Sequence, residues 1–396
     1  MTVAGTGLVS IIVPTFNRAR YLPATLDSLL RQTTAACEIF VVNDGSSDDT
    51  EAVLQGYGNR IVYLAQPNGG KCSAINNALR HAHGKYIWVF DDDDLAGEDA
   101  LARHVAVLER RPEVGYTISG SYRCRHIEAS GELKVLKPQP VRSFADDEDL
   151  LELLLSSYIA GPSTMIRADL LAEVGPYRED LERVDDFEMA LRLALISRPG
   201  RLDEARPSYY RRWHSGLRGK QGQQFAYAES VARSRSEERM VLRDMAAQLT
   251  AERYLPRGEW QAPLDGQKRC RAHLRRWAVA VQKAMWSEAQ TEFAQLCSRR
   301  DDLARLTSSE LVWAQRALSD KNTLLEFDAT PTAQRILAAM LCEPAVAPLR
   351  RAAIQQFYYH LRAALREFDH ARLRFILTLG WSLLGPDFAR RDASAD

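Results

Sequence analysis

The sequence predicts an α/β fold with an open, mostly parallel sheet, followed by an all-helical region. Short runs of β-branched and aromatic residues alternate with helix-period segments over residues 1–120, which is the pattern of stacked βαβ units. A Gly-rich stretch at 216–222 marks a change in composition, and beyond it helical periods dominate to the end of the chain. A length of 396 residues suits two or three domains.

Four buried parallel strands are expected in the first part of the chain. They lie at 9–13, 38–42, 61–64 and 86–90, and we expect Pro14 to end the first of them. Between the strands, leucines from position 22 to position 30 form one helical face behind Pro23, and apolar residues from 74 to 82 form a second face. Since crossovers between parallel strands are almost always right-handed, this order predicts that polar loops gather at the carboxyl edge of the sheet.

The pattern loosens after the fourth strand. A hairpin turn is expected at 128–131, and a Leu-rich helix at 150–155. A loop follows at Gly161-Pro162, and a further helix near 185–196. In the second half, helical periods are punctuated by prolines without the fixed 34-residue period of a repeat array.

Composition excludes several classes of protein. Apolar residues make up 46 % and charged residues 26 %, as in an average globular chain, and the 52 basic residues balance the 52 acidic ones. This balance argues against a polyanion clamp over the whole surface and predicts no nucleic-acid partner, although local charged patches remain compatible with it. Without an apolar run of about 18 to 20 residues or a visible secretory leader, a cytoplasmic location is expected. Six scattered cysteines lack the spacing of a zinc site or a disulfide framework.

Four aspartates, Asp91 to Asp94, directly follow the strand that ends at Phe90. Carboxylates about 4 Å apart repel each other by about 4 kcal/mol per pair at an effective dielectric constant near 20. A hard divalent cation such as Mg²⁺ or Mn²⁺ compensates such repulsion. The alternative is a solvated turn whose acids cap a helix that starts near Glu98.

Two other loops follow predicted strands. Asp44 ends the second strand and is followed by Gly45, so a simple turn, with Ser46 or Ser47 capping the next helix, is one interpretation. The segment 68–71, Asn-Gly-Gly-Lys, precedes another helix, where free N–H groups and a lysine suit an anion. It lacks the spacing of a P-loop.

Taken in order, these segments resemble family 2 glycosyltransferases with the GT-A fold. The matching segments are 13–18, 41–50, 68–71, 84–87, 91–94, 161–163, 174–177, 185–192 and 210–214. The resemblance covers about half of the chain. It implies a GT-A domain with a Rossmann-like open sheet at 8–216, and it leaves a helical domain at 217–396 unassigned.

The resemblance also implies an activity. Members transfer a sugar from a nucleotide-diphosphate donor to a hydroxyl group with inversion, so we expect metal-dependent transfer, with UDP-sugars favoured, in cell-surface polysaccharide or glycoconjugate synthesis. The acceptor is expected to be a saccharide, a lipid-linked molecule or a protein. The implied nucleotide-binding residues are Pro14, Thr15, Asn17, Arg18, Asp44, Lys71, Asp91 and Asp92.

Particular roles follow from the same resemblance. Asp44 would accept a hydrogen bond from the nucleobase. Mn²⁺ or Mg²⁺ would be held by Asp93 and Asp91, with His214 as a further ligand. The catalytic base is implied at Asp186, the second acid of a pair before an amphipathic helix, and the positive end of that helix favours an ionised carboxylate there. Ordinary N-capping by either acid of the pair is the alternative.

The helical half leaves several roles open. Acceptor recruitment, contact with a membrane surface through its arginines and the amphipathic stretch 371–384, and homodimer formation are all compatible with it. Glycines 216, 219 and 222 suit a mobile lid or a linker.

Two other functions compete with sugar transfer as interpretations of these residues. A phosphatase of the haloacid dehalogenase type fits poorly, because Leu95 follows the acids where its motif continues to Thr or Val. A non-catalytic scaffold that binds nucleotide sugars is the main alternative. The presence of Asp44, Asp93 and Asp186 together argues against it.

Overall fold

The structure is a computed structural model, and the chain separates into two compact units, Met1–Val241 and Leu242–Asp396. The predicted boundary at 216/217 lies outside the described residues and stays a prediction. The structure describes residues 9–32, 37–126, 133–140, 144–145, 147–156, 159–203, 206–213, 227–319 and 331–367.

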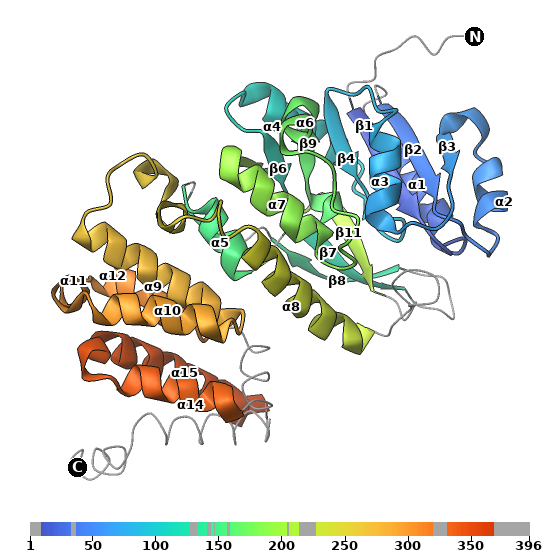
Figure 1. Cartoon of the computed structure of the whole chain (residues 1–396). Coiled ribbons are helices and arrows are strands. Elements are labelled where there is room, and N and C mark those ends of the chain that lie inside the picture. The colour runs from blue at the N-terminus through green and yellow to red at the C-terminus, as the bar shows by residue number, and fades with distance from the viewer. Residues whose placement is uncertain are drawn as a thin grey trace. The chain divides into compact units, whose positions relative to one another are not determined.

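A seven-stranded sheet forms the centre of the first unit (Figure 1). Its strands are β1 (Val9–Thr15), β2 (Cys37–Asn43), β3 (Val62–Ala65), β4 (Tyr86–Val89), β6 (Tyr116–Ile118), β9 (Met165–Arg167) and β10 (Pro199–Arg201). The spatial order is β10-β6-β9-β4-β1-β2-β3. The four predicted strands β1 to β4 are parallel neighbours, and β9 runs antiparallel to both β4 and β6. The α/β open sheet is therefore confirmed.

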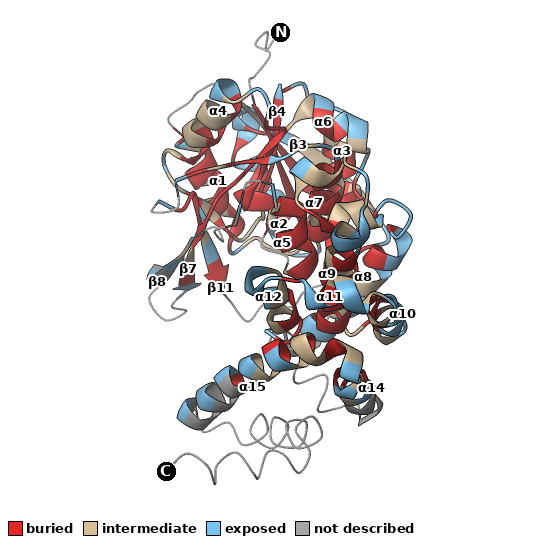
Figure 2. Cartoon of the chain, turned by 90° about the vertical axis from the view of Figure 1, so that its left-hand side faces the viewer, coloured by how far each residue is buried: buried red, intermediate tan, exposed pale blue. Residues whose placement is uncertain are grey.

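The central strands are apolar because both faces of the sheet are covered. In β1, Ile11, Ile12 and Val13 are fully buried. Figure 2 shows the strands at the centre of the sheet in the red that marks buried residues. The prediction that Pro14 ends this strand is wrong, because β1 continues through Pro14 to Thr15. The neighbouring β4 pairs only as far as Ile12, so the missing N–H of Pro14 falls beyond that ladder.

Helices cover the sheet, and two of them bring site residues to its carboxyl edge. The helix α3 packs against β1 and β2 and begins at Lys71, while α7 begins at Asp185 and packs against α5. Pro23 lies in the first turn of α1 as predicted. The helices of this part are α1 (Leu22–Leu30), α2 (Thr50–Gln55), α3 (Lys71–Leu79), α4 (Ala100–Arg110), α5 (Asp149–Leu155), α6 (Ala168–Val174) and α7 (Asp185–Ile196).

A second, four-stranded sheet starts directly after the four aspartates. Its order is β5 (Leu95–Ala96), β11 (Tyr209–Trp213), β7 (Ser121–His126) and β8 (Leu133–Gln139). The strand β11 is antiparallel to β5 and parallel to β7, and β7 and β8 are antiparallel. The hairpin turn predicted at 128–131 lies outside the described residues. The acid run, Asp91 to Asp94, is thus one of the links between the two sheets.

The helix α8 (Tyr227–Asp244) crosses the boundary between the units, and the described part of the second unit is helical, as predicted. Its helices are α9 (Gly266–Gln282), α10 (Trp286–Cys297), α11 (Arg300–Ala304), α12 (Ser308–Arg316), α14 (Pro331–Cys342) and α15 (Ala347–Glu367). The fully buried Trp277 of α9 belongs to its core, and His273 pairs with Glu292 of α10 at 2.7 Å.

Within the described ranges, no helix is both long and apolar enough to cross a bilayer. The stretch 371–384 lies outside those ranges.

Candidate active site

A cavity of about 280 Å³ opens at the carboxyl edge of the large sheet. It is lined from the ends of β1, β2 and β4, the start of α3 and the start of α7. Asp93 and Asp186, from distant parts of the sequence, therefore face one common space. The predicted site residues that line the cavity are Pro14, Thr15, Arg18, Asp44, Lys71, Asp91, Asp92, Asp93 and Asp186.

Lys71 links the acid run to the start of α7. Its Nζ lies 3.1 Å from Asp91 Oδ1, 3.1 Å from Asp185 Oδ2 and 3.8 Å from Asp186 Oδ1. Burial lowers the pKa of Lys71, but the attraction of these carboxylates outweighs burial and raises this pKa well above its ordinary value. The lysine is therefore a fixed positive charge shared by three acids.

Asp186 lies at the second position of α7, and Val184 is the N-cap residue. The alternative that Asp185 or Asp186 caps this helix is therefore wrong, because both side chains belong to its first turn. Burial raises the pKa of Asp186 to about 7, against the lowering effect of Lys71. A carboxylate with a pKa near neutrality can accept a proton under physiological conditions.

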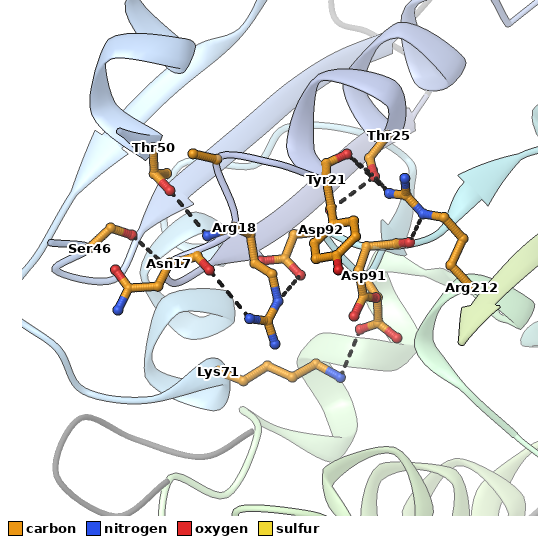
Figure 3. A network of polar contacts seen from close by, with 12 residues as sticks. Asn17, Arg18, Tyr21, Thr25, Ser46, Thr50, Lys71, Asp91, Asp92 and Arg212 are labelled. Carbon is orange, nitrogen blue, oxygen red and sulfur yellow. Dashed lines mark hydrogen bonds and ion pairs between the residues drawn. The ribbon is translucent and has the colours of Figure 1, made fainter. Parts of the chain in front are cut away.

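Arg18 and Asp92 form a second charged contact in the cavity. Arg18 Nε lies 3.8 Å from Asp92 Oδ1, and the Arg18 backbone N–H donates to Thr50 Oγ1 at 3.2 Å (Figure 3). Burial, and next the charge of Asp93, raise the pKa of Asp92 to about 7. The acid run is thus crowded with negative charge, as the sequence predicted.

Asn17 is the predicted site residue that is described but lies outside the lining of the cavity. It has a φ of 53°, and its N–H donates to Ser46 Oγ at 2.9 Å (Figure 3). Its Oδ1 accepts from the Ser47 N–H at 2.7 Å. Asn17 therefore ties the loop after β1 to the loop after β2. Neither serine caps α2, because Asp49 is the N-cap residue of that helix.

Asp44 is 3 % exposed, and its carboxylate accepts four hydrogen bonds. Oδ1 accepts from Gln66 Nε2 and the Gly69 N–H, both at 2.8 Å. Oδ2 accepts from Asn68 Nδ2 at 3.0 Å and the Gly70 N–H at 2.8 Å. A carboxylate has about four acceptor positions, so all those of Asp44 are occupied by donors of neighbouring residues. Asp44 thereby holds the loop that ends at Lys71 in place. The predicted contact with a nucleobase stays a prediction.

Arg212 is a structural residue of the site, a role that the sequence did not suggest. It is 6 % exposed, its N–H donates to Asp94 Oδ1 at 2.9 Å, and its Nη2 donates to Thr25 Oγ1 at 2.8 Å. It also donates to the carbonyl of Asp93, and Thr25 donates to the carbonyl of Asp92 at 2.9 Å. Figure 3 shows Arg212 beside Thr25 and Tyr21. Side chains alternate between the two faces of a strand, so Arg211 and Arg212 of β11 lie on opposite faces. This alternation was the one feature of the sequence that separates the roles of the two arginines.

Glu237 of α8 is a second residue that was missed. Its carboxylate accepts from the backbone N–H groups of Glu182 (3.3 Å), Arg183 (2.8 Å) and Val184 (3.2 Å), directly before α7. Arg233, one turn earlier, contacts the Glu182 carboxylate at 3.4 Å. Glu237 lies beyond the segment covered by the resemblance, so no motif pointed to it.

Residues 10–175 match the family model described as Glycosyl transferase family 2. This stretch is a family 2 glycosyltransferase domain. The resemblance seen in the motifs is thereby confirmed.

Curated relatives of this glycosyltransferase domain carry consistent names. An uncharacterized glycosyltransferase of Rickettsia prowazekii is 32 % identical over 48 % of this chain and 59 % of its own length. The chondroitin synthase of Pasteurella multocida is 31 % identical over 48 % of this chain and 19 % of its own length. This chain thus spans less than two thirds of these relatives.

One solved structure that the chain resembles is the S. aureus TarS 1-349 complex with UDP-GlcNAc. It is 20 % identical, covers 91 % of either chain and has a TM-score of 0.48.

The acid run of the glycosyltransferase domain suits a divalent cation only in part. Asp91 and Asp93 offer two carboxylates, which matches the one or two that Mg²⁺ takes when substrate phosphates complete its shell. In the ranges that the structure describes, no group of three or more His, Cys, Asp or Glu side chains is arranged to hold a metal ion. His214 and the glycines at 216, 219 and 222 lie outside those ranges.

Proposed function

We propose that this chain is an inverting glycosyltransferase that moves a sugar from a nucleotide-diphosphate donor to a hydroxyl acceptor. The observation that carries the proposal is the cavity that holds the acid run and Asp186 together, joined by Lys71. We favour a UDP-sugar as the donor, on the resemblance of the motifs.

The donor is proposed to bind between the loops that follow β1 and β2 and the start of α3. Thr15, Arg18 and Lys71 contribute polar groups there, and the N-terminal N–H groups of α3 suit a phosphate. Asp44 contributes by ordering the loop 68–71. A nucleobase that bound Asp44 would replace one of its four present donors.

Asp93 and Asp91 are the residues proposed to hold Mn²⁺ or Mg²⁺. When bound, such a cation acts as a Lewis acid that neutralises charge on the leaving diphosphate. Asp92 lies beside Arg18 and is assigned to the nucleotide instead.

Asp186 is proposed to act as the general base. The acceptor oxygen forms a bond to the anomeric carbon while the bond from that carbon to the diphosphate oxygen breaks, and the hydroxyl proton passes to Asp186. Attack opposite the leaving group inverts the configuration. A positioned base contributes about 10²- to 10⁴-fold to such a step. Lys71 and the backbone contact of Glu237 hold the start of α7, and so orient this carboxylate.

We propose a glycan acceptor in cell-surface polysaccharide or glycoconjugate synthesis. The names of the relatives, among them a chondroitin synthase and a hyaluronan synthase, support this class. We also predict a cytoplasmic location with membrane contact and a homodimer. A lipid-linked or protein acceptor remains an alternative to a glycan.

Donor hydrolysis tests the proposal and its main alternative. UDP-, GDP- and dTDP-sugars are incubated with Mn²⁺ and the wild-type chain or Asp186→Asn, and nucleotide binding is measured in parallel. We expect the wild type to turn over at least one donor, and the variant to lose about 10²-fold or more while it still binds the nucleotide. Nucleotide binding without turnover of any donor would favour the non-catalytic scaffold.

A further inference from the structure

We propose that Arg123, Arg125 and Trp213 form a subsite for a carboxylate or phosphate group of the acceptor glycan. The inference rests on the proposed function, because it names the class of acceptor. It concerns three residues of the small sheet to which the donor and base assignments give no role.

The three residues share one face of the small sheet with Arg211. In the parallel pair of β7 and β11, Arg123 lies opposite Arg211, and Arg125 lies opposite Trp213. Tyr122 and Tyr210 stack with their ring centroids 5.1 Å apart, and the alternation of the strands puts them on the other face.

Both arginines rest on the indole of Trp213. Their guanidinium carbons lie 5.1 Å (Arg123) and 5.3 Å (Arg125) from the ring centroid. Among the described residues, no carboxylate lies within ion-pair distance of either guanidinium. The ring therefore fixes two planar, fork-shaped donors without using their hydrogen-bonding edges.

This arrangement concentrates positive charge on one face. Arg123 is opposite Arg211 on one side, and Arg125 is opposite Lys134 of β8 on the other. Like charges directly opposite each other destabilise a sheet, so a bound oxyanion would relieve the repulsion. The chain as a whole has a net charge of zero, so the cluster does not reflect a generally basic surface.

The cluster continues from the proposed donor cavity. Arg211 lines that cavity together with Asp186, and Trp213, two residues further along β11, is 38 % exposed. An acceptor whose hydroxyl reaches Asp186 can extend past Arg211 onto this face. Arginine pairs carboxylates and phosphates through two parallel hydrogen bonds, which gives the subsite its chemical preference.

Calorimetric binding of matched tetrasaccharides tests the subsite without requiring turnover. The probes are a galacturonic acid tetrasaccharide, its neutral methyl ester, maltotetraose and phosphorylated maltotetraose. We expect the wild type to bind each anionic probe at least tenfold more tightly than its neutral partner, with an advantage that shrinks as salt rises. The two anionic probes distinguish a carboxylate subsite from a phosphate subsite.

The variant Arg123→Gln/Arg125→Gln removes the two charges, and Arg80→Gln/Arg110→Gln removes two charges elsewhere in the same unit. We expect only the first variant to lose the anionic preference, with unchanged binding of UDP-sugar. Equal binding of acid and ester by the wild type, or an unchanged preference in the first variant, would overturn the subsite. So would an equal loss of UDP-sugar binding, because the arginines would then serve the donor. Failure of donor hydrolysis in every protein would instead count against the proposed function.

Discussion

At the scale of single residues, the site is organised by charge sharing. Lys71 contacts three carboxylates, of which Asp91 belongs to the acid run and Asp185 and Asp186 belong to α7. Without that cation the three acids would repel each other across a buried space. Lys71 therefore controls both where Asp186 lies and how readily it is ionised.

Replacing Lys71 tests this control. Burial raises the pKa of Asp186 to about 7, and Lys71 works in the opposite direction. Since the proposed base, Asp186, must be deprotonated to accept a proton, wild-type activity should fall as pH drops through about 7. In Lys71→Met the pKa rises further, so we expect the acidic limb of the pH–rate profile to move up by about one unit or more. Lys85→Met is the exposed control, and an unmoved limb in Lys71→Met would contradict the assignment.

Asp44 gives a prediction about stability and donor binding. In Asp44→Asn one carboxylate oxygen is replaced by an NH₂ group, which must face at least one of the four groups that donate to Asp44. That buried N–H group then loses its acceptor. Such a loss costs about 1–3 kcal/mol. We expect a lower urea midpoint and weaker UDP-sugar binding, whereas Asp49→Asn, at an exposed position, should change neither. Normal stability together with lost uridine binding would favour a direct nucleobase contact.

At the scale of elements, helix α8 holds the start of helix α7. Three consecutive N–H groups before α7 donate to one carboxylate of α8, Glu237. The first turn of a helix needs acceptors for its free N–H groups, and here a distant helix supplies one just ahead of that turn. The orientation of Asp186 is thereby coupled to the docking of α8.

Glu237→Gln tests that coupling. Glutamine has one acceptor oxygen and an NH₂ group that faces the N–H groups, so the loop before α7 loses its common anchor. We expect kcat to fall about tenfold while the KM for the donor stays within about twofold, because Glu237 contacts the segment before α7 and not the loops after β1 and β2 that are proposed to bind the donor. Glu238→Gln removes the same charge from the same helix as the control. A change in donor KM alone would show that Glu237 acts on donor binding.

Helix α4 carries a pH-sensitive contact. The buried His104 bonds Thr117 Oγ1 through Nδ1 at 2.7 Å and Ser208 Oγ through Nε2 at 3.3 Å, and burial lowers its pKa to about 3. The unfolded-state pKa is about 6.5, so this stabilisation is complete above about pH 6.5 and declines as pH falls below it. We expect the urea midpoint to fall between pH 7.5 and 5, with a smaller fall in His104→Gln. The exposed His83→Gln should retain the wild-type slope, and an equal slope in all three would contradict the role of His104.

At the scale of the whole molecule, local patterns predicted the elements but not all of their neighbours. The runs that became β1 to β4, and the helix at 185–196, were found because apolar periodicity is a local property. The insertion of β9 between β4 and β6, and the pairing of β11 with β5 and β7, could not be read this way. Strand pairing depends on residues far apart in the chain, and each of these strands is short.

The same holds for the candidate site, where local patterns predicted many residues but not the contacts between distant segments. The motifs identified nine of the residues that line the cavity, because their spacing resembles a known family, but not the segment Leu181 to Arg183 before α7. They suggested no structural role for Arg212 or Glu237, whose partners include backbone atoms of other segments. They also missed that the acceptor positions of Asp44 are already filled.

By itself, the sequence determined the α/β class, the helical second half and which polar residues follow the ends of the strands, because these features depend on neighbouring residues along the chain. Only the tertiary structure decided that Lys71 joins the acid run to Asp186, that Glu237 anchors the start of α7, and that two arginines share one indole. Those contacts depend on how distant segments meet, and hydrogen bonds and charges act over a few ångströms in space, whatever the separation in sequence.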